Sequence, residues 1–293
     1  MRYGITGNTN KEKLWEPVAS LSAWMLDQGI EFCLHESVAA GLIRRALLDA
    51  TICSQRSERD LAGSVDVVLS FGGDGTLLNT AHEVGERGTP ILGVNIGRLG
   101  FLAEIEEAGL QDSIRRLEAG DYRIEPRMVL SAEARGADLA ANWALNEFVL
   151  ERAGSSKMIA VDVRVDGDFL NNYWCDGLIL ATPTGSTAYS LSTGGPIMAP
   201  GCGAVILTPI APHTLTVRPI VLPDTSVIEA RVESRGQPYV ISADGISSLI
   251  EHDSVTLTIR RGAHTVNLVK LPEQHYFQTI RTKLMWGARH GGN

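Results

Sequence analysis

The sequence predicts two domains of different class: an α/β N-terminal domain with a parallel sheet over residues 1–122, and a mostly antiparallel C-terminal domain over residues 123–293. In the first part, short apolar runs alternate with segments of helical spacing, which is typical of a parallel sheet with right-handed crossovers. In the second part, strand-like segments alternate apolar and polar side chains with a period of two. Turn dipeptides such as Asp166-Gly167 and Arg235-Gly236 separate these segments, as antiparallel structure requires.

The first domain is expected to alternate strands with helices. The segment Val65–Phe71 is almost continuously apolar, which is typical of a strand covered on both faces. In Pro17–Asp27, apolar side chains recur at helical spacing and the pattern stops at Gly29. The expected strands are Arg2–Thr6, Ile30–Leu34, Val65–Phe71 and Pro90–Asn95, and the expected helices are Pro17–Asp27, Ala39–Ala50 and Leu77–Arg87.

The second domain is expected to consist mostly of short strands. The segments Val161–Val165 and Val255–Ile259 alternate with period two, and Leu178–Ala181 is an apolar strand that leads into a polar loop. Near the C-terminus, Tyr276–Trp286 has helical spacing, so a C-terminal tail can pack back on the first domain.

Composition limits the class of protein and its partners. Of the 293 residues, 44% are hydrophobic and 20% charged, which suits a globular protein with a sizeable core and excludes disordered and fibrous classes. The net charge of −8 argues against nucleic-acid and membrane-surface partners, because both need a basic face. The four cysteines form no C-x-x-C pair, no signal-peptide pattern is seen, and no apolar run reaches the ~18–20 residues of a membrane helix. We therefore expect a cytoplasmic protein.

The strongest functional signal is the segment Gly72-Gly73-Asp74-Gly75-Thr76, which lies between an expected buried strand and an expected helix. Its glycines let the backbone turn sharply and approach a ligand, and the helix N-terminus adds N–H groups and a positive dipole end, so the segment suits phosphate. The carboxylate of Asp74 makes sense beside phosphate if it takes a proton from an attacking hydroxyl or holds a metal ion. The alternative is an N-capping aspartate in a glycine turn.

A second glycine-rich segment, Gly93–Leu102, follows the next expected strand, at the strand end where open α/β sheets bind ligands. Within it, Arg98 can pair with phosphate. Phe101 can stack on a ring, and the alternative is that it packs in the core.

Two polar segments stand out in the second part. Asn146-Glu147 interrupts an apolar pattern and can bind ribose hydroxyls or a base edge; the alternative is a solvent-facing pair on a strand. Asp176–Ser192 runs from an apolar strand into a loop dense in hydroxyls, which suits a nucleotide; the alternative is a Ser/Thr-rich turn. Neither G-x-x-x-x-G-K-[ST] nor G-x-S-x-G occurs, and no G-x-G-x-x-G follows the first strand, so three familiar motifs are excluded.

With these segments, the sequence resembles the bacterial-type NAD kinases. The matching stretches are F-G-G-D-G-T-L-L at Phe71–Leu78, G-R-L-G-F-L at Gly97–Leu102, Asn146-Glu147, Asp176–Ser192, P-H-T-L at Pro212–Leu215 and K-L-M-W-G at Lys283–Gly287. The resemblance implies an α/β domain and a β-sandwich-like domain with NAD bound between them. It also implies that ATP, with a divalent metal cation such as Mg²⁺, donates a phosphoryl group to the adenosine ribose 2′-hydroxyl and gives NADP.

The resemblance assigns roles to individual residues. Asp74 matches the family's proton acceptor and Gly75 its neighbour at the NAD site, while Gly72, Gly73, Gly75 and Thr76 would form the loop for the ATP phosphates. Phe101 would lie against the dinucleotide, and Asn146 and Glu147 would hold its adenosine part. The remaining NAD-binding positions are Lys157, Asp176, Thr187, Ala188, Tyr189, Ser190, Leu191, Ser192 and Ala211. Ala211 and His213 match positions that reach a neighbouring subunit's site, which implies a homodimer or homotetramer.

Three positions depart from the family pattern: Ile246 stands where Gln is common, Lys157 where His is common, and Trp174 where Arg is common. Two other functions compete with NAD kinase. A lipid or sugar kinase can share G-G-D-G but has no use for Asn146-Glu147 and the Thr187–Ser192 segment. A non-catalytic dinucleotide sensor has no use for Asp74 beside a phosphate.

Overall fold

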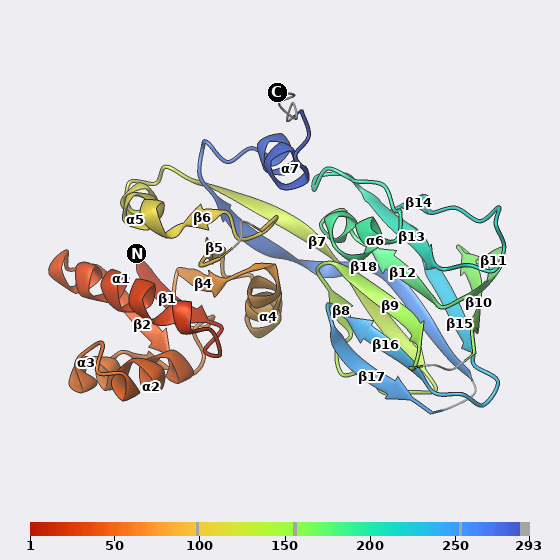
Figure 1. Cartoon of the computed structure of the whole chain (residues 1–293), viewed down its shortest axis with the longest axis horizontal. Coiled ribbons are helices and arrows are strands. Elements are labelled where there is room, and N and C mark those ends of the chain that lie inside the picture. Colours follow the sequence, from red (N-terminus) through yellow and green to blue (C-terminus); the bar gives the residue numbers. More distant parts are fainter. Residues whose placement is uncertain (98–99, 155–156, 252–253, 288–293) are drawn as a thin grey trace, which may run out of the picture. The chain divides into compact units, whose positions relative to one another are not determined.

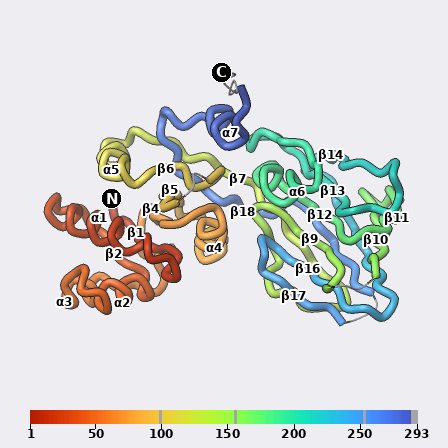
Figure 2. The backbone as a smooth tube through the Cα atoms, viewed as in Figure 1, coloured from red at the N-terminus to blue at the C-terminus, as the bar shows by residue number. Residues whose placement is uncertain are grey.

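The computed structural model describes residues 1–97, 100–154, 157–251 and 254–287. The chain forms two compact units (Figure 1): Met1–Pro126 with Val266–Asn293, which we call unit 1, and Arg127–Thr265, which we call unit 2. It passes between them within two long strands, β7 (Arg123–Arg135) and β18 (Ser254–Lys270), which the tube in Figure 2 follows. The last segment of the chain, from Val266, therefore belongs with the first unit.

Unit 1 is built on a parallel sheet, as the alternating pattern predicts. The central strands lie in the order β5–β4–β1–β2–β3, with β6 beside β5. Their bounds are β1 Arg2–Gly7, β2 Glu31–His35, β3 Ser57–Glu58, β4 Val67–Gly72, β5 Ile91–Asn95 and β6 Ile105–Glu106. In the register, Gly7 pairs with Phe71 and Gly72 with Asn95, so the carboxyl ends of β1, β4 and β5 lie at one edge. The glycine-rich segments after β4 and β5 both start there.

The helices of unit 1 cover this sheet and close its core. They are α1 Trp15–Asp27, α2 Glu36–Arg44, α3 Ala50–Gln55, α4 Asp74–Val84, α5 Leu110–Glu118 and α7 Tyr276–Leu284. The apolar faces of α1, α2, α3 and α5 join the strands in one buried cluster, which includes Trp15, Tyr3 and Phe71. Among the residues that the structure describes, no helix is long and apolar enough to cross a membrane.

Two expected helices of unit 1 are wrong in their extent. The helix predicted over Leu77–Arg87 begins at Asp74 and ends at Val84. The helix predicted over Ala39–Ala50 ends at Arg44, and Ala46 adopts a left-handed backbone with φ of 53°. A second helix, α3, begins at Ala50, because the Asp49 carboxylate caps it by accepting hydrogen bonds from the N–H groups of Thr51 (2.8 Å) and Ile52 (3.2 Å). The helical spacing continues across this break, so periodicity alone did not reveal it.

The strands of unit 2 pair antiparallel, which confirms the mostly antiparallel structure expected for the second domain. One run of strands has the order β14–β13–β12–β9–β16–β17, and the other the order β11–β10–β15–β18. The bounds are β8 Trp143–Ala144, β9 Glu147–Arg152, β10 Ile159–Val165, β11 Asp168–Cys175, β12 Gly177–Ala181, β13 Ala204–Ile210, β14 Ile220–Pro223, β15 Ile228–Glu233, β16 Tyr239–Ala243 and β17 Ile246–Ile250. Buried side chains from both runs, such as Val161 and Leu178, share one core, as in a sandwich.

Candidate active site

The glycine-rich loop of unit 1 folds as its sequence predicts. The fully buried strand β4 ends at Gly72, Gly73 is the N-cap, and α4 begins at Asp74. A Cβ atom at Gly72 would overlap with the Thr76 side chain, so the turn requires glycine there. A Cβ atom at Gly73 or Gly75 would meet no heavy atom within 4 Å, so this side of the turn is open. The first N–H groups of α4, which have no partner inside the helix, therefore border space that an anion can enter.

The carboxylate of Asp74 is held by three consecutive peptide groups. Its Oδ2 accepts the N–H of Phe101 at 2.8 Å, and its Oδ1 accepts those of Leu102 at 3.0 Å and Ala103 at 3.2 Å. A Cβ atom at Gly100 would overlap with Oδ1, so glycine is needed for this approach. Among the residues described, Oδ2 accepts a single hydrogen bond, and a carboxylate oxygen can accept two. That oxygen can therefore also receive a hydroxyl from a ligand.

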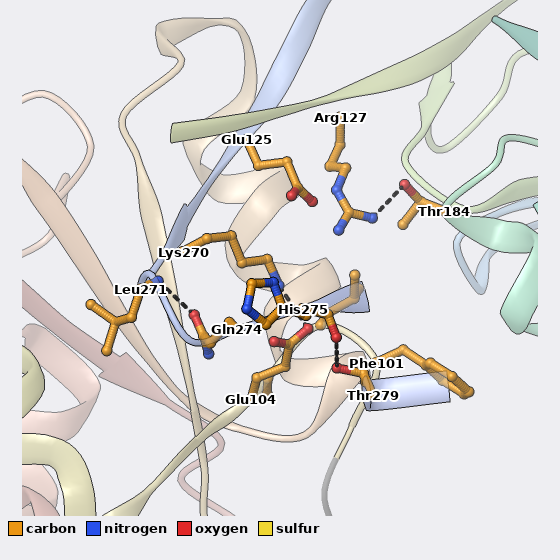
Figure 3. Close-up of polar contacts among 12 residues, drawn as sticks. Phe101, Glu104, Glu125, Arg127, Thr184, Lys270, Leu271, Gln274, His275 and Thr279 are labelled. Atoms are coloured by element: carbon orange, nitrogen blue, oxygen red, sulfur yellow. Dashed lines mark hydrogen bonds and ion pairs between the residues drawn. The ribbon is translucent and has the colours of Figure 1, made fainter. Parts of the chain in front are cut away.

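The segment after β5 carries Phe101, which lies within unit 1 beside the C-terminal helix (Figure 3). Its ring is half-buried, unlike the fully buried Phe71, so it is not a core residue. The Lys283 ammonium lies 5.3 Å from the ring centroid, within the range of a cation–π contact. Arg98, which the sequence suggests as a phosphate partner, lies outside the residues that the structure describes.

In unit 2, Asn146 and Glu147 are both buried, with 7% and 8% of their surfaces exposed. This excludes the alternative of a solvent-facing polar pair. Asp244, in the turn between β16 and β17, fixes their backbone: its Oδ2 accepts the N–H of Leu145 at 2.7 Å, and its Oδ1 accepts those of Asn146 at 2.8 Å and Glu147 at 3.2 Å. The pair therefore sits on a backbone that a carboxylate orders.

The electrostatics of Glu147 are unusual. Burial, and then the charge of Asp244, raise the pKa of the Glu147 carboxyl from 4.5 to about 8, although a hydrogen bond from the Tyr189 backbone opposes this. Its Oε2 is buried and has no hydrogen-bond partner among the residues described. Near neutral pH the carboxyl is mostly protonated, so it can offer one O–H donor and accept through its other oxygen. A polar group of this kind left unsatisfied is costly, and a ligand with hydroxyls would satisfy it.

The hydroxyl-rich loop folds against this pair. The Thr182 Oγ1 donates to the Leu145 carbonyl at 2.6 Å, and the Thr182 N–H donates to the Asn146 carbonyl at 2.8 Å. A Cβ atom at Gly185 would overlap with the Asn146 backbone. Thus the loop and the Asn146-Glu147 pair, which are 35 or more residues apart in sequence, meet in space.

The six positions expected to line the dinucleotide, Thr187–Ser192, are not equivalent. Ser190 is fully buried and its hydroxyl shares a hydrogen bond of 2.9 Å with Thr208, so that hydroxyl supports the loop. Tyr189 and Ser192 are exposed, and Thr187, Ala188 and Leu191 are half-buried. Burial and the charges of Glu151 and Asp176 raise the pKa of the Tyr189 hydroxyl, which places Asp176 near this loop.

Four other positions singled out by the sequence also belong to unit 2. Asp176 is bound by the Arg152 guanidinium, with 2.7 Å between Nε and Oδ1, and Arg152 also donates to the Gly154 carbonyl at 2.7 Å. Lys157 is exposed just before β10. Ala211 is exposed after β13 with a φ of 44°, and Trp174 stacks under the Arg235 guanidinium at 4.5 Å.

Sequence reasoning missed some residues of these sites. Sequence reasoning assigned no role to Asp244, although Asp-Gly at positions 244 and 245 is a typical hairpin turn. The buried Arg127, whose Nη1 donates to Thr184 Oγ1 at 3.3 Å, had no signal in its local sequence (Figure 3). Within the described ranges, no group of three or more His, Cys, Asp or Glu side chains is placed to hold a metal ion.

The two units together define a class: an α/β unit with an anion-binding glycine turn and an aspartate beside it, and a β-sandwich unit with a buried polar pair, as in a nucleotide-dependent phosphotransferase. Comparison with known protein families gives one match in each half of the chain. The ATP-NAD kinase N-terminal domain matches residues 3–122, and the ATP-NAD kinase C-terminal domain matches residues 145–271. The chain belongs to the NAD kinase family.

Individual relatives agree with this assignment. An NAD kinase of Porphyromonas gingivalis is 43% identical over 288 residues, and one of Cytophaga hutchinsonii is 38% identical over 290 residues; each alignment covers 98% of both chains. Among solved structures, an Archaeoglobus fulgidus NAD kinase in complex with ATP has a TM-score of 0.74 at 26% identity, covering 97% of this chain and 99% of the other. Yeast NADH kinase complexed with NADH shares the fold, with a TM-score of 0.88 at 24% identity, covering 100% of this chain and 90% of the other.

Proposed function

We propose that this member of the NAD kinase family phosphorylates the adenosine ribose 2′-hydroxyl of NAD with ATP as donor, giving NADP. Family membership across both units supports the proposal. The observation that carries the chemistry is the Asp74 carboxylate: it stands at the first residue of α4, beside an open glycine turn, and Oδ2 can still accept a hydroxyl. A carboxylate in an anion-binding turn is unfavourable unless it has a task there.

In this mechanism the turn Gly72–Thr76 binds the ATP phosphates through the N–H groups at the start of α4. The ribose 2′-oxygen attacks the γ-phosphorus, the bond from this phosphorus to the β–γ bridging oxygen breaks, and ADP leaves. The hydroxyl proton passes to Asp74 Oδ2. Because the transition state of phosphoryl transfer is loose, the protein contributes mainly by positioning the reactants and by stabilising charge.

A divalent cation, with Mg²⁺ the natural choice for ATP, is part of this proposal. At the glycine turn the structure places the carboxylate of Asp74, and among the described residues it shows no cluster of three ligating side chains. This fits Mg²⁺, which commonly binds through one or two carboxylates together with substrate phosphates and water. When bound with ATP, the ion neutralises phosphate charge.

Most of the proposed NAD contacts belong to unit 2. The buried Asn146 and the mostly protonated Glu147 supply donors and acceptors for ribose hydroxyls or the adenine edge. The loop Thr187–Ser192 adds backbone and hydroxyl groups, and Asp176 lies near it. Gly75, Phe101, Lys157 and Ala211 remain proposed contacts on the strength of the family pattern.

We also propose a homodimer or homotetramer in the cytoplasm. Ala211 and His213 are exposed, as residues that reach a neighbouring subunit must be before assembly. All four cysteines are free thiols, and three are buried, which suits a reducing compartment.

The test is to incubate the protein with ATP, MgCl₂ and NAD and to measure NADP by coupled dehydrogenase assay, with diacylglycerol and a hexose as alternative acceptors. We expect NADP to form, and to fall by about 10²–10⁴ in the Asp74→Asn variant, the usual contribution of a general base. Calorimetry should show that this variant still binds NAD. Transfer to the lipid or the sugar, or NAD binding without turnover in the wild type, would replace the proposal by a competing function.

A further inference from the structure

A buried ion pair in unit 1 lies next to the loop that holds Asp74. Lys270, at the end of β18, is only 4% exposed, and its Nζ lies 2.7 Å from Glu104 Oε1 (Figure 3). Lysine is among the residues least often buried, and a buried charge needs a partner. A hydrophobic pair would fill the same space without that cost, so the retained charges call for a reason.

The position of Glu104 in the chain supplies that reason. It directly follows Phe101, Leu102 and Ala103, whose N–H groups bind the Asp74 carboxylate. Residues 101–104 belong to no helix or strand, so no regular ladder of hydrogen bonds holds them. The N–H groups of the loop are bound by Asp74, its far end runs into β6 at Ile105, and the Glu104 side chain just before β6 is bound by Lys270.

We propose that the Lys270–Glu104 pair is a positioning device for Asp74. It holds the loop Gly100–Glu104 in place, and the loop's three N–H groups then set the orientation of the Asp74 carboxylate. Neither Lys270 nor Glu104 is assigned any contact with substrate. The inference rests on the proposed role of Asp74 as the group that accepts the ribose proton.

The consequence for catalysis is a loss of kcat with little change in KM. An error of about 1 Å in a reacting group can cost on the order of 10²-fold in rate. ATP would still bind at the glycine turn, and NAD would keep its proposed contacts in unit 2, so among the proposed NAD contacts only Phe101 belongs to the loop that the pair holds. A purely structural pair would instead lower the fraction of folded enzyme and leave the turnover of each folded molecule unchanged.

The test uses the double variant Lys270→Met/Glu104→Leu, which removes both charges and leaves neither unpaired in the interior. We expect kcat per folded enzyme to fall tenfold or more, with the KM values for ATP and NAD within threefold of the wild type. Tyr3→Phe is the matched control: it removes the 2.6 Å hydrogen bond from the buried Tyr3 to Glu118 in the same unit, far along the sequence from the loop. Its kcat should stay within twofold.

Hydrogen–deuterium exchange supplies a readout that needs no substrate. In the double variant, the amides of Phe101, Leu102 and Ala103 should exchange at least tenfold faster, while those of β4 keep the rates of the Tyr3→Phe control. Unchanged exchange at these amides, or an unchanged kcat, would overturn the inference. A wild-type protein that makes no NADP would instead refute the proposed function, and the exchange result would then decide the loop-holding role by itself.

Discussion

The raised pKa of Glu147 predicts that the stability of this protein depends on pH through one carboxyl group. Between about 4.5 and 8, an unfolded chain has lost the Glu147 proton and the folded chain still holds it. The unfolded state therefore binds fewer protons in this window, and the free energy of unfolding falls as pH rises. The favourable contribution is fully present below pH 4.5 and is lost as pH rises towards the folded pKa of about 8.

The magnitude follows from the shift. At 1.36 kcal/mol for each pH unit, the whole window corresponds to about 5 kcal/mol, and the interval from pH 5.5 to 7.5 to about 3 kcal/mol. Glu147→Gln keeps the shape of the protonated side chain and removes its titration. We therefore expect the variant to gain stability relative to the wild type by about 1.4 kcal/mol for each pH unit across this interval.

The assay is urea unfolding of both proteins at half-unit steps from pH 5.5 to 9, followed by tryptophan fluorescence. Every other titrating group is common to the two proteins, so the difference in unfolding free energy isolates Glu147. The Asp244→Asn variant is a useful third protein. It removes the Asp244 charge, the second cause of the raised Glu147 pKa, so the pH at which the stability stops falling should move lower. A difference between wild type and Glu147→Gln that stays flat with pH would refute the reasoning.

Three further predictions concern binding and assembly. Lys157→Ala should raise KM for NAD about ten- to a hundredfold with little change in kcat, because a charge-assisted hydrogen bond to phosphate is worth roughly 1.5–3 kcal/mol. The wild-type KM should also rise more steeply with ionic strength than the KM of the variant. An unchanged KM with the same salt dependence in both proteins would show that Lys157 is a solvated side chain with no contact to NAD. Asn146→Ala should weaken NAD binding more than ATP binding in calorimetry, whereas equal losses would contradict the placement of the NAD site in unit 2. Light scattering at micromolar concentrations should give at least twice the chain mass of 31.6 kDa, and a value near 31.6 kDa would exclude the oligomer.

The fold was predictable wherever local pattern decides it. An apolar run, a glycine turn and helical spacing in succession predicted a buried strand followed by a helix, and the structure has both, with the helix starting at Asp74 instead of Leu77. The antiparallel class of unit 2 follows from period-two alternation, as β10 shows. The break between α2 and α3 was missed, because the capping role of Asp49 competes with a periodicity that runs through it.

The sequence indicated which residues belong to the candidate site, but it did not indicate which contacts those residues make. Because Asn146 and Glu147 are buried, they are not a solvent-facing polar pair. Their burial at the start of β9 depends on the loop that begins at Thr182 and on Asp244. Those partners are more than 30 residues away along the chain, so a single sequence contains no local sign of them. The Lys270–Glu104 pair was missed for the same reason, since 166 residues separate the two.

Asp74 and Asp244 use the same local arrangement, each within its own unit. In both, Oδ2 accepts the first of three consecutive N–H groups and Oδ1 accepts the next two, and the three residues belong to a segment that carries candidate site residues. A carboxylate suits this task because it has two accepting oxygens, whereas the amide of Asn has one.

Because of this shared arrangement, the Asp74→Asn substitution has two effects. The substitution removes the proposed proton acceptor and also weakens the hold on residues 101–103, so lost turnover alone does not separate the two effects. Asp244→Asn removes an equivalent set of bonds without touching the proposed proton acceptor. If proton transfer is the task of Asp74, Asp244→Asn should act mainly on KM for NAD, and Asp74→Asn should lower kcat by far more. Similar kcat losses in the two variants would mean that ordering the loops, and not proton transfer, is what these carboxylates contribute.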